Sequence, residues 1–329
     1  MNNIYQKKVR ECYYCKSKDL IEHSKATYWN YADLNYEECA NCGLIFANPM
    51  LSLETIIFGN KALNIVHTSR GTLNQYKGGK QFSFWLNKIK NYGTILDVGC
   101  AEGFFLKGIA DHSDWSVEGI DIIQSAVDFA NNILGIKVYF TTLEDFKTEK
   151  KYDLIRINNV IEHCLNPILF LKKSYTLLNN NGFVWCSTPN GIQDGAVLKN
   201  ANKRGIKLNL LENHLFLYKP KTLKEIFRSI GFTVIKSYCE GIKHSLKDFG
   251  LIPFSKIDNN NSKFFLSDYI YKENIIFSIT DKELNEIYNS SDLKNYKLKL
   301  DIFLKKLFPI KMFWGISVGH QQFILAQKK

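Results

Sequence analysis

The feature that most constrains this chain is a short apolar strand that ends in a glycine turn and leads straight into a helix. Residues 94–98 (TILDV) have strand character, 99–103 (GCAEG) form the turn, and 104–109 (FFLKGI) have helical character. Small residues in such a turn let the backbone approach a ligand closely, and glycine adopts backbone conformations that other residues avoid. The segment therefore predicts an α/β fold with a ligand at the carboxyl end of this strand.

A carboxylate at the end of the next predicted strand supports a nucleoside ligand. Residues 115–120 (WSVEGI) read as a strand, and Asp121 follows it, 22 residues beyond Gly99. In nucleotide-binding folds an acid at this place accepts hydrogen bonds from the ribose hydroxyls. The plainer alternative for Asp121 is a solvated loop carboxylate. The turn has the spacing G-x-A-x-G, which differs from the G-x-G-x-x-G of dinucleotide-binding enzymes.

With its flanks, the turn at residues 96–103 (LDVGCAEG) resembles the first motif of class I S-adenosylmethionine-dependent methyltransferases. Further stretches resemble later motifs of that family in chain order. They are residues 118–121, 137–140, 143–146, 151–155, 159–167, 177–183, 187–190 and 214–234. The last of these stretches is similar to the subgroup that includes ubiquinone-biosynthesis O-methyltransferases. The resemblance covers about residues 92–240. It implies an α/β, Rossmann-like, seven-stranded mixed sheet whose last strand is antiparallel, and S-adenosylmethionine as the cofactor.

The resemblance also implies which residues contact the cofactor. By this resemblance the residues that contact the cofactor are Asp97, Gly99, Cys100, Ala101, Gly103, Asp121, Ile122, Glu144, Asp145 and Asn159. Asp145 matches the residue that faces the adenine amino group, and Glu144 could take its place. Asp97 has an alternative role, which is to support the turn by accepting backbone N–H bonds. The chain departs from the family at Ala101, where glycine is common, and at Asn159, where an aspartate would offer a metal ligand.

Two histidines are the candidate catalytic residues. Methyl transfer from a sulfonium is an in-line displacement, so the protein aligns donor and acceptor and, for a hydroxyl acceptor, removes a proton. His163 follows the predicted fourth strand, and His214 precedes the helix that leads into the sixth. An imidazole titrates near neutral pH, which suits a general base. The alternative is that His163, with Glu162, orders the cofactor loop and that His214 only packs.

Four of the eight cysteines predict a metal site near the start of the chain. Cys12 and Cys15 form one Cys-x-x-Cys pair, Cys39 and Cys42 form another, and 23 residues separate the pairs. This spacing lets four thiolates surround a tetrahedral Zn²⁺, and a closed four-thiolate site indicates a structural role. Two disulfides or a redox pair are the alternatives. Residues 42–49 (CGLIFANP) resemble the zinc module that is fused to many bacterial members of the family.

The chain divides into five predicted parts. These are a zinc ribbon at 1–50, a helical connector at 51–90, the cofactor-binding core at 91–240, a helical insertion or lid at 241–315 and the last strand at 316–329. Between the cysteine pairs, aromatic residues such as Tyr28, Trp29 and Tyr36 could stack on a base or sugar, or supply the small core of the module. The insertion could instead mediate oligomer contacts, and its lysine-rich stretch 291–311 has the pattern of a membrane-surface helix.

Charge and composition bear on location and partners. The net charge is +11, but only five basic residues are arginine and the lysines are spread along the chain, so we expect no nucleic-acid partner. No apolar run approaches the roughly 18 residues of a membrane helix. The first residues lack the apolar core of a secretory signal, so we expect a cytoplasmic protein.

We therefore expect a methyltransferase that acts on a hydroxyl of a small molecule or sugar in bacterial envelope polysaccharide biosynthesis, with the acceptor class resting on family analogy alone. The alternatives are an RNA methyltransferase whose zinc module binds RNA and a non-catalytic protein that binds a partner. Against the RNA alternative, residues 158–161 read NNVI rather than the N-P-P-[FY] used for exocyclic base amines. The acceptor atom and the oligomeric state stay open at this stage.

Overall fold

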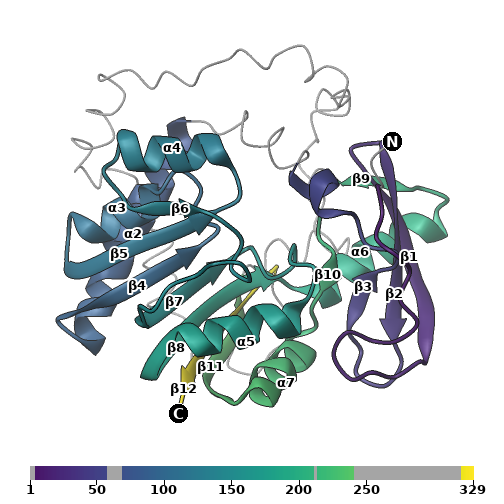
Figure 1. Cartoon of the computed structure of the whole chain (residues 1–329). Helices are drawn as coiled ribbons and strands as arrows, with labels where there is room; N and C mark the ends of the chain where they lie inside the picture. Colours follow the sequence, from purple (N-terminus) through teal and green to yellow (C-terminus); the bar gives the residue numbers. More distant parts are fainter. Residues whose placement is uncertain (1–3, 58–68, 211–212, 241–319) are drawn as a thin grey trace, which may run out of the picture.

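The computed structural model describes residues 4–57, 69–210, 213–240 and 320–329, which form two β-sheets with helices packed around them (Figure 1). The predicted insertion at 241–315 lies outside the described residues. In the described part, no helix is long and apolar enough to cross a membrane.

The larger sheet has seven strands in the order β11-β12-β8-β7-β4-β5-β6. Five of them, β4 to β8, run parallel to their neighbours, while β12 lies antiparallel between β8 and β11. This is the predicted mixed seven-stranded α/β sheet with an antiparallel last strand. The strands are β4 Tyr92–Val98, β5 Asp114–Asp121, β6 Val138–Phe140, β7 Tyr152–Asn158, β8 Leu178–Pro189, β11 Phe232–Glu240 and β12 Gln321–Lys328.

Helices cover both faces of this sheet because alternate residues of its strands are apolar on both sides. On β4, Ile95 packs into a core with α2, α3 and α4, and its neighbour Leu96 packs into a second core with α5 and α7. Residues 81–89, whose apolar spacing predicts a helix, lie within α2. The named helices are α2 Ser69–Ile89, α3 Phe104–Ala110, α4 Gln124–Asn132, α5 Pro167–Leu177, α6 Gly191–Lys203 and α7 Pro220–Ile230, and residues 53–57 are also helical.

Local sequence signals explain the ends of several helices. The side chain of Asn166 accepts hydrogen bonds from the backbone N–H groups of Ile168 and Leu169, and Pro167 occupies the first turn of α5. Both features are typical of a helix start. Gly231, with φ +111°, follows the last residue of α7 and turns the chain into β11. Glycine is favoured here because a side chain would be strained at positive φ.

The smaller sheet joins the N-terminal cysteine region to the larger domain. Its order is β10-β3-β2-β1-β9, where β1 is Leu20–Tyr28, β2 Ala32–Cys39, β3 Ile45–Ala47, β9 Leu208–Leu210 and β10 Phe216–Leu217. The two edge strands β9 and β10 come from the predicted core segment 91–240, far along the chain from the other three. Figure 1 shows β10, an edge strand of the smaller sheet, on the side of that sheet that faces the larger domain. The sheet therefore crosses the predicted boundary at residue 50.

Most of the aromatic residues between the cysteine pairs form core. Tyr28, Trp29 and Tyr36 are buried, while Tyr31 is 54% exposed. The buried rings belong to the same apolar core as α5 and α7 of the larger domain. This burial favours the core interpretation of these side chains over a stacking surface.

Candidate active site

The candidate site lies where two adjacent parallel strands end. The glycine turn follows β4, and the loop at 159–163 follows β7, its neighbour in the sheet. From β4 the chain continues outward to β5 on one side, whereas β7 leads to β8 on the other. Open α/β sheets bind ligands in the crevice at such a reversal of strand order. A Cβ atom on Gly99 would meet Cγ2 of Val160 at 2.5 Å, so the turn and the β7 loop are in direct contact.

The turn has the strained backbone that its small residues permit. Gly99 and Gly103 have φ values of +69° and +80°, and Ala101 has +49°. Positive φ is uncommon for residues with a side chain, so Ala101 takes the family's glycine position at some cost. Gly103 is also the N-cap of α3, and its αL conformation sends the chain from the turn into the helix.

Asp121, at the end of β5, is bound to the turn. Its Oδ2 accepts the backbone N–H of Ala101 at 2.8 Å, and its Oδ1 accepts that of Ile123 at 2.9 Å. The side chain is buried, and burial raises the pKa of Asp121 to about 6 although both hydrogen bonds favour the ionised form. The carboxylate therefore lies at the predicted cofactor site, and its charge is held in place by the backbone of the turn.

Asp97 forms an ion pair with an arginine on the neighbouring strand β7. Both of its carboxylate oxygens accept hydrogen bonds from Nη1 of Arg156, at 2.7 and 2.8 Å, and Asp97 is fully buried. The guanidinium lies 3.6 Å from the centre of the Phe105 ring. Burial raises the pKa of Asp97 against the lowering effect of Arg156. The contacts thus give Asp97 a buried ion pair with Arg156, and its expected role in cofactor binding stays a prediction.

The other predicted cofactor residues lie around the same edge of the sheet. Cys100 is buried against Gly119, and Ile122 is half-buried after Asp121. Glu144 and Asp145 are both exposed, and Oδ2 of Asp145 accepts a hydrogen bond from Oγ1 of Thr142 at 2.9 Å. The exposed side chains leave both acids accessible to an adenine ring, and the structure does not discriminate between them.

Asn159, which begins the loop after β7, has φ +52°, a conformation that asparagine tolerates better than most residues. Its side-chain oxygen accepts a hydrogen bond from Gln321 at the start of β12. The loop after β7 is thereby tied to the last strand of the sheet. Sequence analysis had no signal for this contact, since 162 residues separate the two side chains.

The two candidate histidines, distant in sequence, lie together. The ring centres of His163 and His214 are 5.1 Å apart with the planes at 60°. Nδ1 of His163 contacts the carbonyl oxygen of Asn213 at 2.9 Å. Because a carbonyl oxygen can only accept, Nδ1 of His163 is the protonated nitrogen. The segment before α7 is therefore joined to the β7 loop at the predicted catalytic residues.

Two carboxylates flank the histidine pair on different sides. Glu162 is buried, accepts a hydrogen bond from Oγ1 of Thr188 at 2.9 Å, and lies with Oε1 4.0 Å from Nε2 of His163. On the other side, Oδ2 of Asp194 lies 3.7 Å from Nδ1 of His214. Asp194 belongs to the first turn of α6. Sequence analysis missed Asp194 because only the packing of α6 brings it to His214.

Four cysteine sulfurs form a second site, in the N-terminal module. Each Sγ lies within 4.8 Å of the other three, with Cys12 and Cys42 at 3.6 Å and Cys15 and Cys39 at 3.4 Å. All four cysteines are free thiols. The residue after each pair, Lys16 or Gly43, has positive φ (+61° and +72°), so both pairs make the same tight turn. Four sulfur donors at these separations fit one tetrahedral ion, for which a Zn–S length of about 2.3 Å places the sulfurs about 3.8 Å apart.

Comparison with protein families places the site in a known class of domain. Residues 74–237 match a family model described as a methyltransferase domain. Residues 74–237 form a class I S-adenosylmethionine-dependent methyltransferase domain. The match spans the glycine turn and both histidines.

Curated relatives of the methyltransferase domain transfer methyl groups to different atoms. The chain is 31% identical over 109 residues to a ubiquinone biosynthesis O-methyltransferase of Rickettsia canadensis, covering 32% of this chain and 46% of the relative. It is 28% identical over 105 residues to (S)-tetrahydroprotoberberine N-methyltransferase of Eschscholzia californica, covering 30% of each protein. The chain thus spans less than half the length of these relatives, which include both O- and N-methyltransferases.

Two of the solved structures with detectable likeness to this chain are methyltransferases. The plantazolicin methyltransferase BpumL in complex with SAH has 16% identity and a TM-score of 0.45, with 84% of this chain and 91% of that chain covered. A SAM-dependent methyltransferase from Archaeoglobus fulgidus has 16% identity and a TM-score of 0.41, with 77% and 94% covered. At these TM-scores the likeness carries no information on the acceptor.

Proposed function

We propose that this protein transfers a methyl group from S-adenosylmethionine to a hydroxyl of a small polar acceptor, such as a sugar or glycan precursor, and that His214 is the general base. The observation that carries the proposal is the His163–His214 pair, 5.1 Å apart and joined to the loop that contacts the glycine turn. A proton acceptor beside the cofactor turn is the arrangement that O-methylation requires.

The residues of the turn fit the cofactor. The contact between Gly99 and Val160 leaves no room for a side chain at position 99, and Asp121 carries a buried charge at the end of β5, where ribose hydroxyls can donate to it. S-adenosylmethionine, when bound, supplies a methyl group on a positively charged sulfur that is already a good leaving group. The protein's own tasks are then to orient the two substrates, exclude water and accept the hydroxyl proton.

The two flanking carboxylates favour His214 over His163 as the base. Oδ2 of Asp194 lies 3.7 Å from Nδ1 of His214, which favours a proton on Nδ1, and we therefore assign to Nε2 the lone pair that takes the acceptor's proton. In His163 the carboxylate of Glu162 lies near Nε2 itself, which favours a proton on that nitrogen. His163, whose Nδ1 donates to the carbonyl oxygen of Asn213, is better suited to position the His214 segment at the acceptor site.

The polar character of this edge of the sheet supports a hydroxyl-bearing acceptor. Asn213, next to His214, is fully buried, and neither its amide nitrogen nor its amide oxygen has a hydrogen-bond partner among the described residues. A buried amide without a partner costs about 1–3 kcal/mol, which a hydroxyl group could recover by bonding to it. An apolar acceptor would leave this cost in place.

The experiment compares His214→Asn with His163→Asn, incubated with labelled S-adenosylmethionine and candidate sugar nucleotides. We expect His214→Asn to reduce turnover at least about 10²-fold, as loss of a general base does, with unchanged affinity for S-adenosylhomocysteine by calorimetry. His163→Asn should raise KM for the acceptor more than it lowers kcat. If both variants retain near-normal turnover, base catalysis by this pair is wrong.

A metal ion is the alternative way in which this cluster could activate a hydroxyl, since Glu162, His163 and His214 lie close enough to hold a cation. A mild chelator that leaves the cysteine site loaded tests it. Under our proposal turnover survives the chelator; loss of turnover that added Mg²⁺ or Mn²⁺ restores would replace the base with a metal.

We also propose that the four cysteines bind one structural Zn²⁺. The support is the set of four free thiols within 4.8 Å of one another at two matching turns. A hydrogen bond from the Cys42 thiol lowers the pKa of Cys12, while the same pairing raises the pKa of Cys42 and burial raises that of Cys39. With all four positions taken by sulfur, such an ion has no place for water or substrate.

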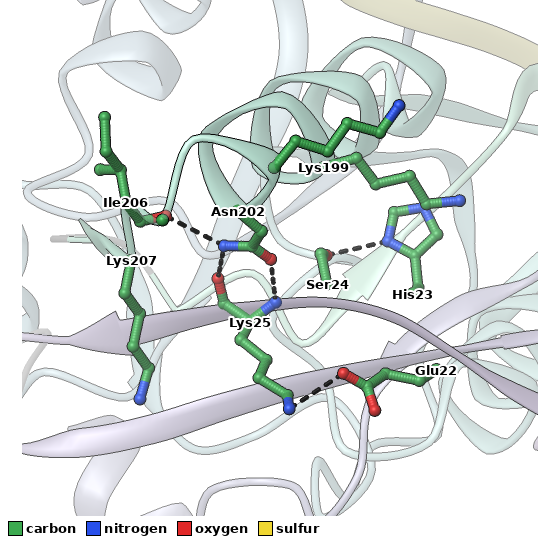
Figure 2. A pocket seen from close by; sticks show the side chains of 10 residues that line it. Glu22, His23, Ser24, Lys25, Lys199, Asn202, Ile206 and Lys207 are labelled. Atoms are coloured by element: carbon green, nitrogen blue, oxygen red, sulfur yellow. Dashed lines mark hydrogen bonds and ion pairs between the residues drawn. The ribbon is translucent and has the colours of Figure 1, made fainter.

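One feature favours the RNA methyltransferase as a second candidate. A hollow of about 740 Å³ lies between β1, α6 and the loop that precedes β9. Figure 2 shows lysines that line it and could contact phosphates. However, three of these lysines have carboxylate partners: Lys25 lies 2.9 Å from Glu22, Lys199 3.7 Å from Glu38 and Lys207 2.5 Å from Asp33.

Much of the positive charge in this hollow is therefore compensated, and the small-molecule acceptor is favoured. Filter binding to RNA at increasing salt tests the second candidate. Phosphate contacts would give tight binding with a steep loss of affinity as salt rises. We expect weak binding that Lys199→Ala and Lys203→Ala leave unchanged.

A further inference from the structure

We infer that the four-cysteine module is a working part of the acceptor site, in which Tyr36 acts as a positioning residue for His214. The inference rests on the proposed function for the role of His214. It gives the module a role in turnover beyond its own folding, through a hydrogen bond between the module and the catalytic segment.

The first observation is the contact itself. Tyr36, on β2 of the module, donates its hydroxyl hydrogen to the backbone carbonyl oxygen of His214 at 2.7 Å. Tyr36 is fully buried, so water does not compete for this bond. Burial also raises the pKa of Tyr36 far above its ordinary value, and the hydroxyl therefore stays a donor at any working pH.

The second observation is that the module also forms backbone hydrogen bonds with the residues that follow His214. The N–H of Ala47 donates to the carbonyl oxygen of Leu215 at 2.8 Å, and β3 pairs with β10 so that Phe46 lies opposite Phe216. The N–H of Leu215 in turn donates to the carbonyl oxygen of Glu162 at 2.8 Å. The His214 segment is thus held between the module on one side and the loop that carries His163 on the other.

The third observation ties Tyr36 to the cysteine cluster. β2 ends at Cys39, three residues beyond Tyr36, and between them Glu38 pairs with Lys219 at the start of α7. The carbonyl oxygen of Cys42 accepts a hydrogen bond from Thr222 on α7 at 2.8 Å. Because the cluster anchors the end of β2, a change in the cluster reaches His214 through one short strand.

The test compares Tyr36→Phe with Tyr28→Phe. Each removes one buried hydroxyl from the same module, but Tyr28 lies on β1, and among the described residues its hydroxyl makes no hydrogen bond to the His214 segment. We expect Tyr36→Phe to lower kcat about 10-fold, since a small displacement of a catalytic group has effects of up to about 10²-fold. KM for S-adenosylmethionine, affinity for S-adenosylhomocysteine and zinc content should match those of Tyr28→Phe.

A second measurement needs no activity. In hydrogen exchange followed by mass spectrometry, Tyr36→Phe should speed exchange in residues 213–218 relative to Tyr28→Phe, while a peptide spanning β5 stays protected in both. Removal of the cysteine-bound metal from the wild-type protein should loosen the same segment. Equal kcat and equal exchange in the two variants would overturn the inference.

The exchange result also separates this inference from the proposed function. If the wild-type protein shows no methyl transfer but Tyr36→Phe still loosens residues 213–218, the proposed function fails and the structural coupling stands. If transfer occurs and neither kcat nor exchange responds to Tyr36→Phe, the coupling fails alone.

Discussion

The carboxylate of Asp121 accepts the backbone N–H of Ala101 at 2.8 Å, which ties the end of β5 to the glycine turn after β4. A cofactor whose ribose donates to this carboxylate would therefore touch both strands through one side chain. The bond also explains why a buried charge is tolerated here, because backbone N–H groups replace part of the lost hydration.

We predict that cofactor affinity falls at acidic pH through Asp121. Its pKa is raised from 3.8 to about 6 by burial, and ribose hydroxyls bind the ionised form. Binding of S-adenosylhomocysteine should therefore weaken as pH drops below 6, by about tenfold at pH 5. Calorimetric titration between pH 5 and 8 measures this, and Asp121→Asn should bind weakly with no such dependence. A flat profile for the wild type would rule out Asp121 as the ribose ligand.

The same shift predicts how the unliganded protein's stability varies with pH. Because the folded pKa lies above the unfolded one, Asp121 favours folding below pH 3.8, and this contribution is lost as pH rises through about 6. The difference corresponds to about 3 kcal/mol. Urea unfolding at several pH values, compared with Asp121→Asn, isolates this contribution. The prediction is wrong if the wild type becomes less stable relative to Asp121→Asn as pH falls from 6 to 4.

We predict that Gly99→Ala lowers stability and cofactor affinity by more than the strain of an alanine at positive φ explains. Gly135 provides the matched control, since its φ of +65° is close to the +69° of Gly99 but a Cβ there would meet nothing within 4 Å. Gly135→Ala should lose about 1–2 kcal/mol of unfolding free energy. Gly99→Ala should lose more and should bind S-adenosylhomocysteine weakly, because its Cβ would meet Val160 at 2.5 Å.

A second change checks this steric explanation. Val160→Ala removes the methyl group that the new Cβ would meet, so Gly99→Ala combined with Val160→Ala should recover part of both losses. Denaturant unfolding and calorimetry measure the two effects. Equal behaviour of Gly99→Ala and Gly135→Ala would mean that close packing at the turn is unimportant.

We predict that the buried Asp97–Arg156 pair is sensitive to the loss of one partner. Arg156→Met should destabilise the protein by about 3–5 kcal/mol, because it leaves the fully buried Asp97 without its counter-charge. Asp97→Asn combined with Arg156→Met should be clearly more stable than Arg156→Met alone. The exposed pair Lys221–Glu225 is the control, and Lys221→Met should change stability by less than about 1 kcal/mol. Denaturant midpoints decide between these outcomes.

We predict one zinc per chain, lost when a cluster cysteine is replaced. Cys39→Ser should lower the metal content and the thermal midpoint, because metal binding is coupled to folding of the module. Cys239→Ala, which changes a buried cysteine outside the cluster, should keep the metal. Elemental analysis of the purified proteins measures the content. A metal-free wild-type protein with the same thermal midpoint as the zinc-loaded form would remove the zinc assignment.

The sequence by itself determined the features that depend on neighbouring residues. The strand–turn–helix at 94–109, Asp121 at the end of the next strand and the two Cys-x-x-Cys turns could all be predicted, because glycine, apolar periodicity and ligand spacing act within a few residues. The family resemblance extended this to the seven-stranded sheet and its antiparallel last strand. These features locate a cofactor site but not its surroundings.

Only the tertiary structure decided which distant residues meet. His163 and His214 are 51 residues apart in sequence, and Asp194, Tyr36 and Arg156 reach their partners through packing that no local pattern records. The smaller sheet is the clearest case, since β9 and β10 complete a sheet that begins in the cysteine module. The physical reason is that strand pairing and side-chain burial depend on the whole fold, whereas turns and caps depend on the adjacent chain.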